Sequence, residues 1–355
     1  MSYKVIDLFS GVGGFHLGFE KAGDYEIVLA TDIDEHCEIF NNKNTPHIPF
    51  IKGDIKDLDR EVLKKYVGDT NVDVLIGGPP CQGFSTIGAR ISADEKKRRQ
   101  KDARNVLFKD YIRVLKLVKP KVFLMENVVG MLTLDNGNYI KMIKEEFGKL
   151  NEDLKDELNG EEYKFDVFVL DAADYGVPQR RRRVFIFGNR IGMEVVPPKK
   201  THGEEIYLIP YETVGKAIGD LAGLENQIEN HVPLNHGEIN VRRYEYIPEG
   251  GRLPEDKLPP ELYRKNFGNT FKRLHRNEPS LTMVPGHNAF PIHPWLNRSL
   301  TVREAARIQT FPDDLVFVGP RHKQCMQVGN AVPPLLAQKW AEHIKKGLDK
   351  YYEKK

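Results

Sequence analysis

A cysteine follows two prolines in the segment GGPPCQGFS, which spans residues 77–85 and comes directly after a short apolar run. The prolines stiffen the backbone, so we expect Cys81 on a well-placed loop at the carboxyl end of a strand. Ligand sites of α/β sheets lie beyond these strand ends. A cysteine there can act as a nucleophile once nearby cations or helix N-termini lower its pKa. Most free cysteines are instead buried small hydrophobes, so the segment alone leaves both interpretations open.

Polar residues adjoin two other apolar runs. Glu126 follows one run, and four consecutive arginines precede another. Alternate residues of an extended segment point to the same side, so Arg181 shares a face with Arg183. Arg180 shares the opposite face with Arg182. We expect one pair to point toward a site and the other to meet phosphates, while Glu126 could protonate or hydrogen-bond a substrate heteroatom. Taken singly, each feature also fits an ordinary solvated surface.

A glycine-rich turn, FSGVGGF at residues 9–15, follows the first apolar run. Glycines let a backbone turn sharply and approach a ligand closely. Asp32 follows the next run, about 20 residues beyond Gly11, which is the spacing at which an acid binds ribose hydroxyls. Ile33 beside it could press on an adenine ring, and Asp54 could accept a hydrogen bond from an adenine amino group. The sequence therefore predicts a pocket for an adenosine-containing ligand.

The composition is that of a globular protein large enough to hold two domains. Of 355 residues, 40% are hydrophobic and 29% are charged, and no run approaches the roughly 18 apolar residues that span a bilayer. The net charge is only +2, yet basic residues gather at 90–104 and again at the four arginines. The three cysteines are too far apart for a metal pair or a disulfide framework, and the histidines show no metal-ligand spacing. We expect a cytoplasmic protein without a metal.

Short apolar runs alternate with helical patterns through the first half of the chain. Continuous apolar runs suit strands that are covered on both faces. Alternation of this kind predicts an α/β fold with a doubly wound, mostly parallel, Rossmann-like sheet. The predicted strands are Lys4–Phe9, Ile27–Asp32, Val72–Ile76, Val122–Met125, Phe165–Leu170 and Val184–Phe187. A helical pattern covers Val106–Val118.

The composition and the hydrophobic periodicity of the sequence change twice along the chain. We divide it into 1–192, the alternating domain; 193–298, a smaller domain that is irregular and partly β; and 299–355, which returns to the first domain. Thr301 and Glu304 have the spacing of a capping box, and the helix that they begin should stop before Pro312. The segment QVGNAVPP at 327–334 predicts a polar turn, from which a final helix runs to about Leu348.

With these features in view, the chain resembles the cytosine-5 DNA methyltransferases from end to end. The motifs of that family appear in their usual order: DLFSGVGGF, the acid after the second strand, GDI, GGPPCQGFS, MENV, QRRRRVF, a variable region, LTVREAARIQTFPDD and VGNAVPP. Each short motif is weak by itself, but the ordered set is specific. The resemblance implies an enzyme of the bacterial restriction-modification type. It would transfer a methyl group from S-adenosylmethionine to carbon 5 of a cytosine within a short sequence of double-stranded DNA.

The resemblance also implies roles for individual residues. Cys81 would attack carbon 6 of the cytosine, Glu126 would hold the ring nitrogen and amino group, and Arg181 would bind the ring carbonyl oxygen. Arg183 would support the active-site loop and the acids. The cofactor pocket would be lined by Phe9, Ser10, Gly11, Gly13, Asp32, Ile33, Asp54, Ile55, Pro80, Leu107, Asn330 and Val332. The expected DNA contacts are Gln82, Ser85, Arg98, Arg99, Arg242, Arg243, Lys272, Arg273 and Arg276.

The chemistry explains why such residues are needed. Carbon 5 of cytosine is a poor nucleophile, and addition of a thiolate at carbon 6 breaks the aromaticity and makes carbon 5 reactive. The target base must leave the duplex stack to be reached. By resemblance, the segment 83–104 is the loop that closes over DNA, and 193–298 is the target-recognition domain.

Other interpretations stay open at this point. One is an RNA cytosine methyltransferase acting on transfer RNA. Another is a DNA-binding relative without catalysis, although the intact Cys81, Glu126 and Arg181 argue against it. A nicotinamide dehydrogenase is disfavoured because His16 interrupts the GxGxxG fingerprint. The recognised sequence, a preference for hemimethylated DNA and the existence of a cognate restriction endonuclease are not determined. By analogy we expect a monomer.

Overall fold

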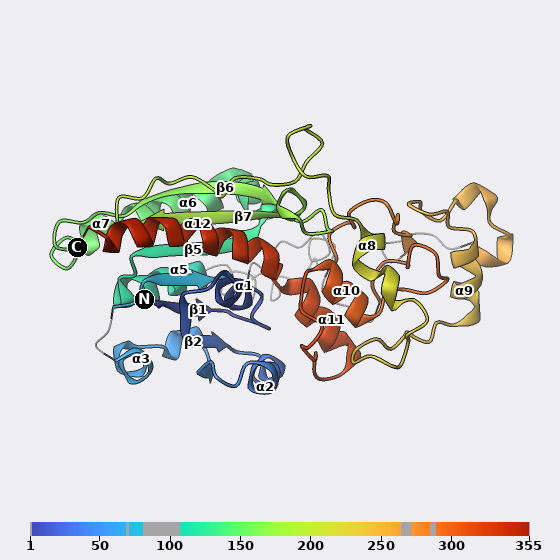
Figure 1. The fold of residues 1–355 in the computed structure, drawn as a ribbon, viewed down its shortest axis with the longest axis horizontal. Helices are drawn as coiled ribbons and strands as arrows, with labels where there is room; N and C mark the ends of the chain where they lie inside the picture. The colour runs from blue at the N-terminus through green and yellow to red at the C-terminus, as the bar shows by residue number, and fades with distance from the viewer. Residues whose placement is uncertain (1, 69–70, 81–106, 264–270, 285–288, 355) are drawn as a thin grey trace.

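The structure is a computed structural model, and it describes residues 2–68, 71–80, 107–263, 271–284 and 289–354. A sheet covered by helices forms the larger part, and helices α8 to α11 with long connecting segments form a smaller lobe beside it (Figure 1). Cys81, Gln82, Ser85, Arg98 and Arg99, together with the whole of the predicted loop 83–104, lie outside the described residues.

Seven strands form one sheet in the order β3-β2-β1-β4-β5-β7-β6. The pairs from β3 to β5 are parallel, whereas β7 is antiparallel to both β5 and β6. The expected doubly wound, mostly parallel α/β sheet is confirmed. The strands are β1 Tyr3–Leu8, β2 Tyr25–Asp32, β3 Phe50–Lys52, β4 Val74–Gly77, β5 Val122–Val128, β6 Lys164–Asp171 and β7 Arg182–Asn189. The sequence did not predict β3, because a strand of three residues leaves too short an apolar run.

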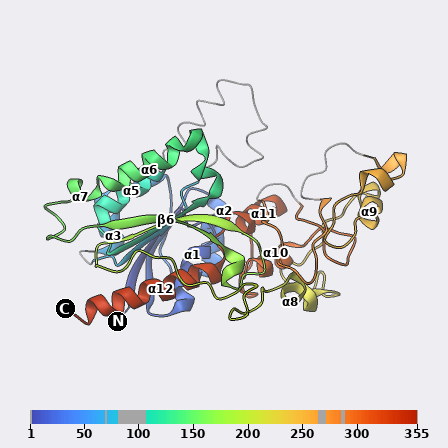
Figure 2. The same ribbon diagram turned by 90° about the horizontal axis from the view of Figure 1, so that it is seen from above.

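Two apolar clusters, one on each face, hold the sheet. Helices α5 and α6 cover one face, and α1 and α12 cover the other (Figure 2). Neighbouring residues of a strand serve opposite faces, so Val5 of β1 packs in the α1/α12 cluster while Ile6 packs in the α5/α6 cluster. Burial on both faces explains the continuous apolar runs. The helices of this part are α1 Gly14–Ala22, α2 Glu35–Asn44, α3 Arg60–Val67, α5 Leu107–Val118, α6 Asn138–Gly148, α7 Leu150–Asp153 and α12 Pro334–Tyr352.

The region 193–298 is less regular. It contains α8 Val214–Ile218 and α9 Glu238–Glu245, and its described residues form isolated bridges but no strand. The described residues of this irregular region thus show β-bridges but no strand, since the many prolines and glycines interrupt any ladder. Helices α10 Val302–Ile308 and α11 Arg321–Asn330 share an apolar cluster with α8. Short 3-10 helices include η1 Ile55–Asp57, η3 Val129–Leu132, η4 Leu134–Gly137, η5 Ala172–Tyr175, η6 Gly219–Leu221, η7 Glu255–Lys257 and η8 Pro260–Leu262.

The C-terminal elements largely follow the sequence signals. The capping box of α10 is present, because Thr301 Oγ1 accepts from the Glu304 amide and Glu304 Oε2 accepts from the Thr301 amide at 2.7 Å. The polar turn predicted at 327–334 is corrected in its first half, which forms the last turn of α11. Val328 is fully buried there in the cluster with α10, so tertiary packing outweighs the low helix propensity of Gly329.

Candidate active site

The predicted catalytic and cofactor residues that the structure describes lie at one edge of the sheet. Leu8, at the end of β1, pairs with Thr31 of β2 and with Gly77 of β4, and Gly77 pairs with Met125 of β5. The carboxyl ends of these four parallel strands therefore lie side by side. The residues that follow each strand end share this edge, where α/β folds bind their ligands.

Glu126 and Arg183 form a buried ion pair at this edge. Their strands β5 and β7 run antiparallel, and Arg183 Nε lies 3.0 Å from Glu126 Oε1. Burial raises the pKa of the Glu126 carboxyl above its ordinary value, although the guanidiniums of Arg183 and Arg181 act in the opposite direction. The carboxyl group thus keeps a proton more readily than an exposed glutamate does, which suits a group that donates a hydrogen bond or proton.

Arg181 occupies a different position from Arg183. Its side chain is 0% exposed, and its Nη2 donates to the carbonyl oxygens of Gly329 at 3.0 Å, Asn330 at 3.3 Å and Ala331 at 2.9 Å. Its Nε and Nη1 have no hydrogen-bond partner among the described residues. The guanidinium therefore holds the carboxyl end of α11, a contact over about 150 residues that the sequence did not predict.

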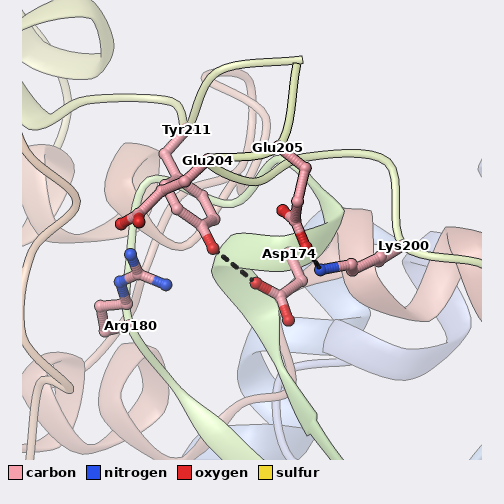
Figure 3. Close-up of a pocket in the computed structure, with 6 residues that line it drawn as sticks. All are labelled: Asp174, Arg180, Lys200, Glu204, Glu205 and Tyr211. Carbon is pink, nitrogen blue, oxygen red and sulfur yellow. Dashed lines mark hydrogen bonds and ion pairs between the residues drawn. The ribbon is translucent and has the colours of Figure 1, made fainter. Parts of the chain in front are cut away.

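The alternation of the four arginines is as predicted. Arg181 and Arg183 point inward, whereas Arg182 is exposed and Arg180 is half-exposed. Figure 3 shows Arg180 at a polar surface pocket of about 460 Å³, with its guanidinium 3.9 Å from the centre of the Tyr211 ring. The Tyr211 hydroxyl donates to Asp174 at 3.0 Å. This pocket contains none of the predicted catalytic residues.

The segment that leads to Cys81 is tied to the end of β5. Asn127 Nδ2 donates to the carbonyl oxygen of Pro79 at 3.1 Å. A Cβ on Gly78 would lie 3.2 Å from Glu126 Oε2, and one on Gly77 would lie 2.7 Å from the Leu8 carbonyl oxygen. The glycines thus let the chain pass close to Glu126. The sequence did not single out Asn127, although its place in the motif MENV directly after Glu126 was a usable signal.

The glycine turn after β1 is left-handed at three positions, with φ of 55° at Phe9, 57° at Gly11 and 73° at Gly13. The Gly11 amide donates to Asp32 Oδ2 at 2.9 Å, so the carboxylate that ends β2 holds the turn. Burial raises the pKa of Asp32. Ser10 Oγ donates to the Thr31 carbonyl oxygen at 3.3 Å.

A buried pair that the sequence gave no signal for supports this turn. His16 Nδ1 lies 3.0 Å from Asp7 Oδ2, and both side chains are fully buried. A Cβ on Gly13 would overlap the His16 ring, so the turn rests directly on the imidazole. His16, which interrupts the GxGxxG fingerprint, therefore packs beneath the turn.

The remaining predicted cofactor residues surround the same edge. Ile33 is an apolar side chain that is 70% exposed between two acids, as a platform for an aromatic ring requires. Asp54 caps η1, while the side chain of Ile55 is buried in the core beneath it. Pro80 and Leu107 are half-buried, Asn330 is exposed, and Val332 is buried. The turn, the acids and the exposed Ile33 fit an adenosine-containing cofactor.

The arginines predicted to contact DNA in the smaller lobe differ in their exposure. Arg242 and Arg276 are exposed and pair with Glu261 and Glu249, and Lys272 is half-exposed. Arg243 and Arg273 are buried and donate to backbone carbonyl oxygens. The prediction that these two residues contact DNA is therefore corrected. Within the described ranges no group of acidic, histidine or cysteine side chains could hold a metal ion. None of the helices described is long and apolar enough to cross a membrane.

The comparisons with known proteins agree on one family. The model of the C-5 cytosine-specific DNA methylases matches residues 3–346. The type II methyltransferase M1.HphI of Haemophilus parahaemolyticus is 41% identical, with 98% of this chain and 87% of that protein covered. M.NgoFVII of Neisseria gonorrhoeae is 36% identical, with 99% and 88% covered.

Solved structures show the same fold. A protein assigned as a prophage-encoded DNA modification methyltransferase of E. coli superimposes with a TM-score of 0.73 at 26% identity, covering 98% of this chain and all of that one. A Spodoptera frugiperda DNMT2 structure gives 0.64 at 18% identity, covering 97% and 100%, which shows the fold alone. On the family match over nearly its whole length, the chain belongs to the C-5 cytosine-specific DNA methylases and is a DNA (cytosine-5) methyltransferase that uses S-adenosylmethionine.

Proposed function

We propose that this chain is the modification enzyme of a type II restriction-modification system, which methylates cytosine within one short duplex sequence in the bacterial cytoplasm. The named relatives M1.HphI and M.NgoFVII are type II methyltransferases and are covered over most of their length. The enzyme would act as a monomer and independently of a cognate endonuclease.

One observation carries the proposed chemistry: the buried Glu126–Arg183 pair lies beside the backbone that leads to Cys81. Asn127 donates to the carbonyl oxygen of Pro79, two residues before the cysteine, and so fixes the described end of the segment that leads to Cys81. The raised pKa of Glu126 favours a protonated carboxyl group that can donate to ring nitrogen 3 of the flipped cytosine. The thiolate of Cys81 would add to carbon 6, and its release would follow loss of the proton from carbon 5.

The structure favours an exchange of the roles that resemblance gave to the two inward arginines. Arg183 contacts Glu126 and is not fully buried, so it is the better candidate to meet the ring carbonyl oxygen. Arg181 has no exposed surface and is occupied by three carbonyl oxygens. A buried guanidinium in this position is suited to holding backbone.

The predicted cofactor residues along the sheet edge would each contact a different part of S-adenosylmethionine. Asp32 would accept from the ribose hydroxyls with the lone pairs that its two backbone hydrogen bonds leave unused. Ile33 would cover one face of the adenine ring. Asn330 and Val332 would close the pocket from the C-terminal side. The bound cofactor supplies an electrophilic methyl group.

Base-resolution sequencing of 5-methylcytosine tests this proposal. DNA would come from methylation-deficient bacteria that express the wild-type protein or Cys81→Ser. Methylation at one short consensus that is absent from the control supports the proposal. A folded, cofactor-binding protein that leaves DNA unmethylated contradicts it, and transfer RNA would then be assayed as the substrate.

A further inference from the structure

Arg181 holds the end of a helix. The last carbonyl groups of a helix lack partners within the helix and carry the negative end of its dipole. Arg181 Nη2 donates to three consecutive ones, those of Gly329, Asn330 and Ala331, at the end of α11. A buried cation is well suited to this place, because it satisfies carbonyl groups that have no partner within the helix.

The backbone held by Arg181 forms a wall beside the glycine turn. A Cβ on Gly14 would overlap the carbonyl oxygen of Val332, so the segment after α11 packs directly against the first residue of α1. Earlier in α11, Lys323 pairs with Asp34 at 2.8 Å and Gln327 Nε2 donates to the His36 carbonyl oxygen at 3.3 Å. Helix α11 thus follows the edge on which Asp32 and Ile33 lie.

The same guanidinium is electrostatically linked to the base site. Arg181 lies two residues before Arg183, and its charge acts on Glu126 by lowering the pKa that burial raises. The buried Arg181 side chain therefore contacts the C-terminal wall directly, and its charge also acts on the Glu126–Arg183 pair. Its other two nitrogens, Nε and Nη1, are buried and have no hydrogen-bond partner among the described residues.

We propose that Arg181 is a positioning residue that couples the cofactor pocket to the base site, by holding the carboxyl end of α11 in the geometry that S-adenosylmethionine requires. The proposal rests on the proposed assignment of Asn330 and Val332 to the cofactor pocket. It predicts that Arg181 sets the affinity for the cofactor even when no cytosine is present. An arginine that only touched the flipped base would leave that affinity unchanged.

The test is calorimetric titration of the full-length protein with S-adenosylhomocysteine in the absence of DNA. We expect Arg181→Lys and Arg181→Met to raise the Kd about tenfold or more, since loss of hydrogen bonds from a buried charged group commonly has an effect of this size. Arg183→Lys should keep the wild-type Kd within about twofold and lose methyl transfer. The matched control is Arg303→Lys, since Arg303 is also fully buried and donates to the carbonyl oxygens of Glu229, Pro312 and Leu315 but does not hold α11.

A second measurement separates positioning from a general loss of folding. Hydrogen exchange should show faster exchange in residues 328–335 of Arg181→Lys, with wild-type protection in the strands. An unchanged Kd in Arg181→Lys would overturn the proposal, and so would an equal rise of the Kd in Arg303→Lys. Because this test uses no DNA, a protein that fails to methylate DNA but shows the expected Kd pattern would contradict the proposed function and leave this inference standing.

Discussion

Two buried arginines, one in each part of the molecule, show how the same side chain serves different ends. Arg273 in the region 193–298 uses all three guanidine nitrogens, and its partners are the carbonyl oxygens of Ile247, Tyr244, His293 and Leu296 and the side chain of Asn297. Arg181 at the sheet edge uses one nitrogen and leaves two without a described partner. Buried polar groups in folded proteins usually have hydrogen-bond partners, so the two nitrogens of Arg181 call for an explanation that Arg273 does not need. The sequence placed both residues in contact with the nucleic acid or its base.

The largest expected effect concerns the sheet edge, where Glu126→Gln removes the proton donor and keeps the shape. We expect the rate of methyl transfer to fall about a thousandfold. Stability should not fall, because the substitution removes a buried carboxyl group whose charge burial disfavours. Single-turnover transfer from labelled cofactor measures the first effect, and urea unfolding measures the second. Turnover within threefold of wild type would exclude Glu126 as the donor.

Substitution of a buried arginine in the smaller lobe should have the opposite effect to Glu126→Gln: it should lower stability and not the rate of methyl transfer. Arg273→Met leaves five acceptors without their donor, and we expect the free energy of unfolding to fall by about 3 kcal/mol. The matched control is its half-exposed neighbour, Lys272→Met, which should change stability by less than about 0.5 kcal/mol. Urea unfolding compares the two. If the DNA affinity of Arg273→Met fell while its stability stayed at the wild-type value, Arg273 would contact DNA after all.

The two parts also differ in the sign of their pH dependence. Burial lowers the pKa of His293 from 6.5 to about 4, so its neutral form is favoured and its contribution to stability is lost as the pH falls from about 6.5 toward 4. Burial raises the pKa of Glu126, so its contribution is present below its ordinary value and is lost as the pH rises through the raised one.

We expect His293→Gln to lose about 2 kcal/mol less stability than the wild type on acidification from about pH 7 to about pH 5. Urea unfolding at both pH values measures the difference. Glu126→Gln provides the contrast, since removal of a carboxyl group whose pKa is raised should increase the loss of stability on acidification. Parallel curves for wild type and His293→Gln would show that His293 does not titrate there.

The smallest effects belong to the exposed arginines. Arg242 and Arg276 pair with surface glutamates, and such pairs contribute little to stability, so their guanidiniums can exchange a carboxylate for a phosphate. Each of Arg242→Ala and Arg276→Ala should lower the slope of log affinity against log salt by about 1. Binding of a duplex of known methylation site, titrated over salt, measures this. Arg243→Lys is the buried control and should keep the slope.

Local patterns in the sequence determined the layout of this protein. The apolar runs located six of the seven strands, because strands buried on both faces leave continuous runs. Asp32 ends β2 as expected, whereas Glu126 lies inside β5, two residues before its end. The capping box at Thr301 and Glu304 began α10 where expected. The alternation of the four arginines also held, since it depends only on the geometry of an extended backbone.

Long-range contacts decided what the individual side chains do. Antiparallel pairing of β7 with β5 brings Arg183 to Glu126, and packing of α11 against the sheet edge brings its carbonyl groups to Arg181. Burial within the smaller lobe withdrew Arg243 and Arg273 from the DNA contacts. A sequence motif gives residue types and spacing, but hydrogen-bond partners and burial depend on segments as far as 346 residues away. Those are fixed only when the chain folds, because the free energy of burying a charge depends on which partners surround it.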